Sequence, residues 1–192
     1  MRLPIVKYGD ATLRAKGKRV VKVDDSIRQL ATDMIETMHA ANGVGLAAQQ
    51  VGRPLQLTVI DVSPAEERPS TLQVDGNVVE LEKVMPLVLL NPELKAGTEK
   101  VLGVEGCLSF PEITADIERA ESVSGTAETL DGKVISFVAT GLIARALQHE
   151  IDHLNGVLFI DRMNSAAKVS WAGKLKRLQK ETRASTRSAP RL

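Results

Sequence analysis

Two histidines lie four residues apart around a glutamate in the segment His149-Glu150-Ile151-Asp152-His153. Residues four apart on an α-helix share one face, so both imidazole rings can direct a nitrogen at a single divalent ion. Glu150 projects about 100° round the helix from His149, which places its carboxylate beside the ion, where it can exchange a proton with water. The spacing therefore predicts a metal site with its own acid-base group, in preference to two unrelated surface histidines.

A tetrahedral catalytic site needs a third protein ligand and an open position. Cys107 is the leading candidate, because a thiolate suits a borderline-soft divalent ion and the extended run before it predicts a position at a strand end. Asp161 and Glu181 are the alternatives, since no histidine follows His153. Taken alone, a single cysteine is more often a small buried core residue.

The composition indicates one domain and excludes two classes of protein. With 192 residues, 43% of them hydrophobic, the chain suits a single domain with a sizeable core. No apolar run approaches the ~18 residues of a membrane span. Met1 to Asp10 contains no apolar core of a secretion signal, and a single cysteine excludes an internal disulfide. We therefore expect a cytoplasmic protein.

Charge is distributed unevenly along the chain. The segment 162–192 contains nine basic residues and one acid, a net charge of +8, whereas residues 1–161 have a net charge of −7. Such a basic block is typical of a contact with nucleic acid or another polyanion. On charge alone, a solvated helix with surplus lysines is an equally good interpretation.

Apolar residues three and four apart predict helices. These cover 25–41, Thr140 to just before Gly156, and Asn164 or Ser165 to about Lys180. Alternating or apolar runs predict short strands at 55–62, 72–74, 78–81, 84–90, 101–104, 122–129, 133–139 and 157–160. The pairs Asp75-Gly76 and Asp131-Gly132 predict hairpin turns.

These elements lack the strand-helix alternation of a parallel sheet, so the expected fold class is α+β. We expect a catalytic metallohydrolase domain at 1–164, followed at 165–192 by a basic helix and a tail. The tail, from Ala184, is expected to be disordered.

The candidate ligands belong to two of three notable segments. The three segments are Gly43-Val44-Gly45-Leu46-Ala47-Ala48-Gln49-Gln50, Glu105-Gly106-Cys107-Leu108-Ser109, and Gln148-His149-Glu150-Ile151-Asp152-His153-Leu154-Asn155-Gly156. Together they resemble the three signature motifs of the peptide deformylase family, in the same order and at similar spacing. The resemblance spans Leu3 to about Asp161. Pro111 and the basic tail are similar to the type common in Gram-negative bacteria and organelles, and the lack of a transit peptide favours the bacterial type.

The resemblance implies a fold, a reaction and a metal. Antiparallel sheets would pack around the central helix that carries the HExxH motif. The enzyme would remove the N-formyl group from the initiator methionine of nascent polypeptides and release formate. Cys107, His149 and His153 would hold one divalent ion. Fe²⁺ is the expected ion, with Zn²⁺ or Ni²⁺ possible in purified protein.

The resemblance also implies roles for residues around the ion. The Gln50 side-chain amide and the Leu108 backbone N–H would stabilise negative charge on the formyl oxygen. Glu150 would transfer a proton from water to the departing amine. The expected substrate-binding residues are Gly43, Val44, Gly45, Gly106, Leu142, Ala146 and His149.

Some features depart from the family pattern or vary within it. Thr114 stands where many relatives have arginine, Arg145 leaves the rim of the pocket uncertain, and 64–83 is longer than in compact bacterial relatives. We interpret that segment as an inserted hairpin near the entrance. One alternative function is an HExxH metallopeptidase that cleaves ordinary peptide bonds. Another is a ribosome-associated module without catalysis.

The basic helix suggests a partner. Its basic side chains could contact ribosomal RNA near the exit tunnel and so keep the enzyme close to emerging chains. They are Lys174, Lys176, Arg177, Lys180, Arg183, Arg187 and Arg191. We expect a monomer with no membrane association.

Overall fold

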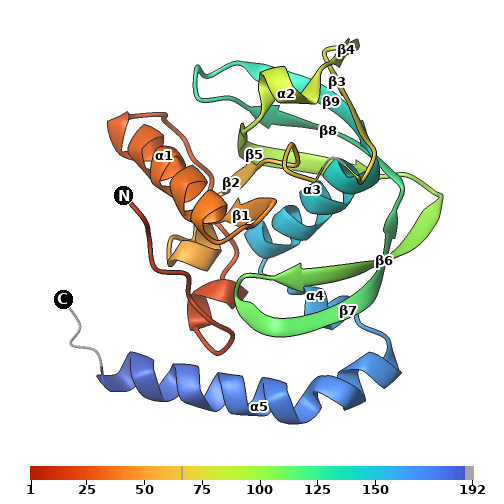
Figure 1. Ribbon diagram of the computed structural model, residues 1–192. Helices are drawn as coiled ribbons and strands as arrows, with labels where there is room; N and C mark the ends of the chain where they lie inside the picture. The colour runs from red at the N-terminus through yellow and green to blue at the C-terminus, as the bar shows by residue number, and fades with distance from the viewer. Residues whose placement is uncertain (66, 189–192) are drawn as a thin grey trace.

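Antiparallel strands surround one central helix in the computed structural model, which describes residues 1–65 and 67–188, with the side chains of 187 and 188 left aside. Seven strands form one sheet in the order β1-β2-β5-β8-β9-β3-β4, and β6 and β7 form a second. Figure 1 shows α3 between the larger sheet and the β6–β7 hairpin, with α5 along the bottom. The expected α+β class, with antiparallel sheets around the helix of the HExxH motif, is confirmed.

The strands range from three to eleven residues in length. The larger sheet comprises β1 Gly45–Ala47, β2 Leu57–Ile60, β3 Ser70–Val74, β4 Asn77–Val79, β5 Leu87–Ala96, β8 Ser122–Glu128 and β9 Val134–Thr140. The second sheet comprises β6 Lys100–Cys107 and β7 Phe110–Ala120. The helices are η1 Ala11–Arg14, α1 Asp25–Ala40, η2 Ala48–Val51, α2 Leu81–Val84, α3 Gly141–Leu154, α4 Phe159–Arg162 and α5 Ser165–Ser188.

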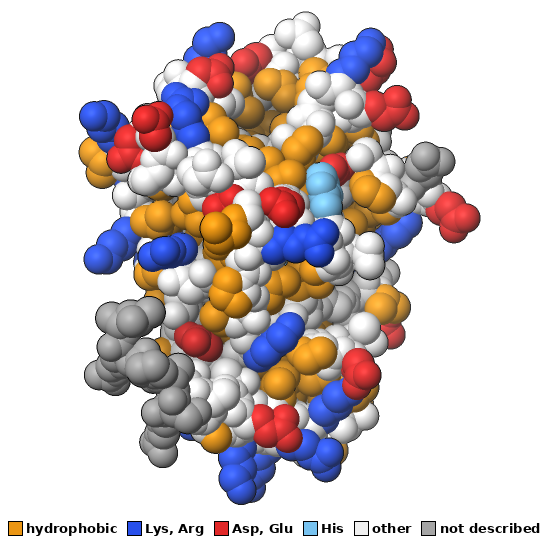
Figure 2. All heavy atoms as spheres, turned by 60° about the vertical axis from the view of Figure 1, so that its left-hand side comes forward, with side chains coloured by type: hydrophobic (Ala, Val, Ile, Leu, Met, Phe, Trp, Pro, Cys, Tyr) orange, Lys and Arg blue, Asp and Glu red, His pale blue; other side chains and the backbone are white. Residues whose placement is uncertain are grey.

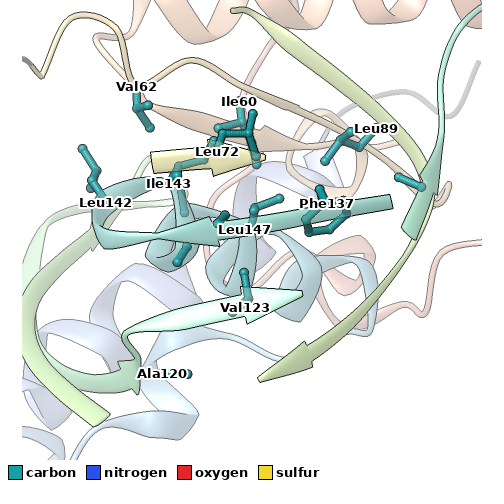
Figure 3. Close-up of a cluster of buried hydrophobic side chains, with 14 residues drawn as sticks. Ile60, Val62, Leu72, Leu89, Ala120, Val123, Phe137, Leu142, Ile143 and Leu147 are labelled. Atoms are coloured by element: carbon teal, nitrogen blue, oxygen red, sulfur yellow. The ribbon is translucent and has the colours of Figure 1, made fainter. Parts of the chain in front are cut away.

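Burial explains why α3 is central. Every residue of α3 after Gly141 is buried, because apolar side chains cover most of its circumference. Ile143 and Leu147 belong to the same cluster as Leu72, Val123 and Phe137 of the surrounding strands (Figure 3). The helix is therefore packed on several sides, which holds its polar residues in fixed positions.

The predicted helices and hairpins are confirmed. Asp24 caps α1 through a hydrogen bond from the Ile27 N–H (3.1 Å), and Asn164 caps α5 through one from the Ala167 N–H (2.9 Å). The turn between β3 and β4 has positive φ at Asp75 (49°) and Gly76 (80°), as an Asp-Gly hairpin turn requires.

Some predicted boundaries were wrong. The strand expected at 84–90 begins only at Leu87, because 81–84 form the short helix α2. The segment expected as a strand at 157–160 instead leads into α4, whose Asp161 side chain accepts from the Leu158 N–H (2.9 Å). Helix α5 continues to Ser188, beyond Lys180 and through the residues from Ala184 expected to be disordered; residues 189–192 lie outside the described part.

Helix α5 packs one face on the body. Its Trp171, Leu175 and Leu178 contact a buried cluster that includes Phe110 and Ile113 of β7. The opposite face carries exposed basic side chains; at the lower end of the molecule, Figure 2 shows basic side chains interspersed with acidic and hydrophobic ones. Within the described residues, no helix combines the length and apolar character needed to cross a membrane.

Candidate active site

The three predicted ligands meet at one point. His149 and His153 lie one turn apart on α3, with ring centroids 5.1 Å apart, and Cys107 is the last residue of β6. The Cys107 Sγ atom lies 3.3 Å from His153 Nε2, and the candidate donor atoms of all three residues lie within 4.8 Å of one another. Of the alternative third ligands, Asp161 pairs with Arg14 and Glu181 is an exposed residue of α5.

The donor set fits a divalent ion. One thiolate and two imidazoles are ligands that tetrahedral sites use, and burial lowers the pKa of His153 well below its ordinary value, so its ring is neutral. Burial also lowers the pKa of His149, but hydrogen bonds with Cys107 and Glu105 outweigh it and raise that pKa well above the ordinary value. An ion that binds there displaces this proton.

A buried ion-pair network fixes the orientation of His149. The Glu105 carboxylate accepts a hydrogen bond from His149 Nδ1 (3.0 Å) and two from Arg119 (2.9 and 3.0 Å). Burial raises the pKa of Glu105, but the hydrogen bonds from His149 and Arg119 outweigh it and lower the pKa to about 2. Glu105 is therefore ionised at neutral pH and leaves the Nε2 atom of His149 for an ion.

The network continues behind α3 to residues that the motifs do not explain. Arg119 donates to Asp152 (2.5 Å), which also accepts from Arg162 (2.5 Å). Arg145, expected near the rim, lines the cavity, is buried and donates to Glu105 (2.9 Å). Sequence analysis missed Arg119 and Arg162, since only their distant partners inside the motifs indicate a role.

Glu150 lies beside the three ligands in a buried position. Its side chain is buried, and its Oε2 atom has no hydrogen-bond partner among the described residues. Burial raises its pKa to about 7. A Cβ atom at Gly45 would clash with Glu150 Oε1, so Gly45 must lack a side chain for Glu150 to take this place. A carboxyl group with this pKa can both accept and release a proton near neutrality.

Gln50 and Leu108 flank the same point. The Gln50 Oε1 atom accepts from the Ala47 N–H (2.8 Å), which turns the amide NH₂ toward Cys107 Sγ (3.5 Å). Leu108 begins the turn between β6 and β7, where its carbonyl accepts from Lys7 Nζ (2.8 Å). The third histidine, His39, contacts Asp61 (2.8 Å) at the end of α1 and takes no part in the cluster.

A cavity of about 530 Å³ opens next to the ligands. All seven residues predicted to bind substrate line it: Gly43, Val44, Gly45, Gly106, Leu142, Ala146 and His149. Gln50, Cys107, Leu108 and Glu150 line it as well. Arg68, from the segment interpreted as an insertion, and residues 111–114 of β7 complete its wall. The site therefore combines a candidate metal centre with a cleft large enough for an amino-acid side chain and adjoining backbone.

Known proteins share this sequence and architecture. The family model described as polypeptide deformylase matches residues 2–169. A peptide deformylase from Opitutus terrae is 43% identical over 192 residues, covering 99% of this chain and all of the relative. The crystal structure of the peptide deformylase from Thermus thermophilus superposes with a TM-score of 0.79 at 35% identity, covering 94% of this chain and 99% of that one. The enzyme from Synechococcus elongatus, in complex with actinonin, gives a TM-score of 0.76 at 39% identity over 90% of this chain and 87% of that one.

Proposed function

The chain belongs to the peptide deformylase family, and we propose that Cys107, His149 and His153 hold the divalent ion with which it works. The protein is a hydrolase that removes the N-formyl group from nascent polypeptides. Cleavage of ordinary peptide bonds, the alternative for an HExxH helix, is not favoured. The observation that carries the proposal is the convergence of one sulfur and two ring nitrogens within 4.8 Å at the end of the cavity.

A divalent ion held by Cys107, His149 and His153 would lower the pKa of water toward neutrality and would so supply a nucleophile for the formyl carbon. We propose Fe²⁺ as the working ion, with Zn²⁺ and Ni²⁺ as further occupants, since the same donors suit all three. Exposure to air is then expected to reduce activity, and a reductant or catalase to protect it. A zinc form that is fully active in air, with no gain from Fe²⁺ or Ni²⁺, would contradict the choice of iron.

The chain's own groups would manage charge and protons. Gln50 is suited to stabilise negative charge on the formyl oxygen, because its amide orientation is fixed by the Ala47 N–H and it lines the cavity. The Leu108 backbone N–H is the second proposed donor, since its turn adjoins Cys107. Glu150, with its pKa of about 7, would take a proton from water and deliver it to the departing methionine nitrogen.

The methionine side chain would occupy the deep end of the cavity. Leu142, Ala146 and Val44 offer an apolar surface there, and the His149 ring closes it. Gly43 and Gly45 belong to the segment that enters β1, where the substrate backbone would pair as an added strand. Gly106 would leave space on the opposite wall.

The proposal extends to location and partner. Residues 1–164 would form the catalytic part, acting as a monomer in the cytoplasm, and 165–192 the part that docks on ribosomal RNA. Lys176, Arg177, Lys180 and Arg183 support this, because all four are exposed on the outer face of α5. Lys174 is left out of this set, since its ammonium pairs with Glu112. The expected contributions of Arg187 and Arg191 fall on side chains outside the described part.

Formate release and metal analysis on the same anaerobically purified protein would test the assignment. We expect formate from formyl-Met-Ala, no free amine from acetyl-Met-Ala, and about one divalent ion per chain. Substitution of Cys107, His149 or His153 by alanine should remove both the ion and the activity. An ion retained at full stoichiometry in these variants would contradict the proposed ligands.

A further inference from the structure

Helix α5 is anchored to the wall of the active-site cavity. Lys174 Nζ contacts two atoms of Glu112, the backbone carbonyl (3.1 Å) and the carboxylate Oε2 (3.0 Å). Two residues further along β7, the Thr114 carbonyl accepts a hydrogen bond from Trp171 Nε1 (2.8 Å). Glu112 and Thr114 both line the cavity that contains the candidate metal centre. The C-terminal helix therefore holds part of that cavity from outside.

The anchored segment has an unusual backbone conformation. Glu112 has φ of 57° within β7. This value lies in the left-handed region, which residues other than glycine rarely adopt. Lys174 Nζ contacts both the carbonyl and the carboxylate of Glu112, and these two contacts favour the left-handed conformation of this residue. The Lys174 ammonium also lies 5.5 Å from the centre of the Trp171 ring, so both α5 residues act as one unit.

The same wall lies at the mouth of the cavity and not at its deep end. Leu142, Ala146 and His149 are at most 8% exposed, whereas the Glu112 side chain is 84% exposed. If the methionine side chain occupies the deep end, the residues that follow methionine in a substrate pass the wall of β7. This placement rests on the function proposed above.

We propose that Lys174 and Trp171 are positioning residues that hold the β7 wall in the form that receives substrate residues beyond formyl-methionine. Neither residue touches the reacting atoms. Their loss is therefore expected to weaken binding of longer peptides and to leave the chemical step unchanged. The substitutions would free only the β7 wall, which is the part of the cavity remote from the proposed metal ligands.

Two formylated substrates of different length would test this. One is formyl-methioninamide, which ends before the wall, and the other is formyl-Met-Ala-Ser. For Lys174→Met we expect the KM of the tripeptide to rise about 3–10-fold, as for loss of one charge-assisted contact, with kcat unchanged. The KM of formyl-methioninamide should stay at the wild-type value. Trp171→Phe keeps an aromatic ring and removes the Nε1–H donor. It is expected to raise the tripeptide KM by a smaller factor than Lys174→Met does.

Lys168 offers a matched control on the same helix. It is exposed and donates to a backbone carbonyl, that of Asp161 (3.1 Å), which does not line the cavity. Lys168→Met should leave both KM values unchanged, and Lys174→Arg, which keeps charge and donors, should restore the tripeptide KM.

Equal changes for both substrates, or none, in Lys174→Met and Trp171→Phe would overturn the inference. Melting temperatures identify a variant that fails to fold. If Lys174→Met fails to fold, the KM values of Trp171→Phe for the two substrates decide whether the inference holds. If the wild-type protein releases no formate from either substrate, the proposed function fails instead.

Discussion

Helices α3 and α5 use their residues in opposite ways. Helix α3 is buried after its first residue, and most of its polar side chains hydrogen-bond to the β6–β7 hairpin. Helix α5 buries one thin face and leaves most basic side chains to solvent. In α3 a one-residue change of spacing would separate the ligands, whereas on the exposed face of α5 the proposed RNA contact would depend on the count and placement of charges more than on any one position. The proposed chemistry therefore depends on the buried helix, and the proposed contact with a partner depends on the exposed one.

The sharpest test of the buried helix is Glu150→Ala. Formate release should fall by about 10²–10⁴-fold, because the variant loses the proton-transferring group and no ligand. The bound ion and the melting temperature should stay near their wild-type values. Activity within a few-fold of wild type would exclude this role for Glu150, and loss of the ion would indicate that its carboxylate is a ligand.

Removing one charge from the network behind α3 should affect stability most. Arg119→Met leaves Glu105 and Asp152 with fewer partners in a buried place, and we expect the free energy of unfolding to fall by about 3 kcal/mol. Arg145 and Arg162 still pair with the two acids, which limits the loss. Urea denaturation would measure it.

An exposed ion pair provides the comparison. Lys83 and Glu80 are paired at 2.8 Å with side chains 72% and 71% exposed. Lys83→Met should therefore change the free energy of unfolding by less than about 1 kcal/mol. Similar losses in the two variants would show that burial does not strengthen the network.

The exposed helix is tested by its charge. Replacing Lys176, Arg177, Lys180 and Arg183 by glutamine should abolish salt-sensitive co-sedimentation with ribosomes and preserve turnover of formyl-Met-Ala. These substitutions are preferable to truncation after Asn164, because truncation would also uncover the cluster on which Trp171 packs. Substituting Lys16, Lys22, Lys95 and Lys100 in the body removes equal charge as a control. If both sets pellet alike, α5 is a solvated helix.

Sequence spacing correctly predicted the features that depend on residues close together in the chain. The histidine interval and the Asp-Gly turns each act within a few residues, so they predicted their elements correctly. Gln50 and Cys107, which belong to two of the three motifs, line the same cavity, although 57 residues separate them in the chain.

The features that the sequence did not predict depend on contacts between segments distant in the chain. Strand β7 contains many charged residues, because half of it faces solvent, and so it lacked an apolar run. Arg119 meets Asp152 across 33 positions, and Lys174 meets Glu112 across 62, and no local pattern encodes either pair. The latter contact gives Lys174 a partner within the chain, which distinguishes it from the other proposed phosphate contacts.

The smallest expected effect concerns a glycine inside α5. A Cβ atom at Gly173 would meet nothing within 4 Å, so Gly173→Ala should raise the free energy of unfolding by about 0.5–1 kcal/mol through helix propensity alone. Gly76 in the β3–β4 turn has equally open space but a φ of 80°, so Gly76→Ala should instead destabilise the protein by about 1 kcal/mol. Urea denaturation of both variants compares the same added methyl group in two backbone conformations. A loss of stability in Gly173→Ala would mean that the outer face of α5 is more confined than its exposure indicates.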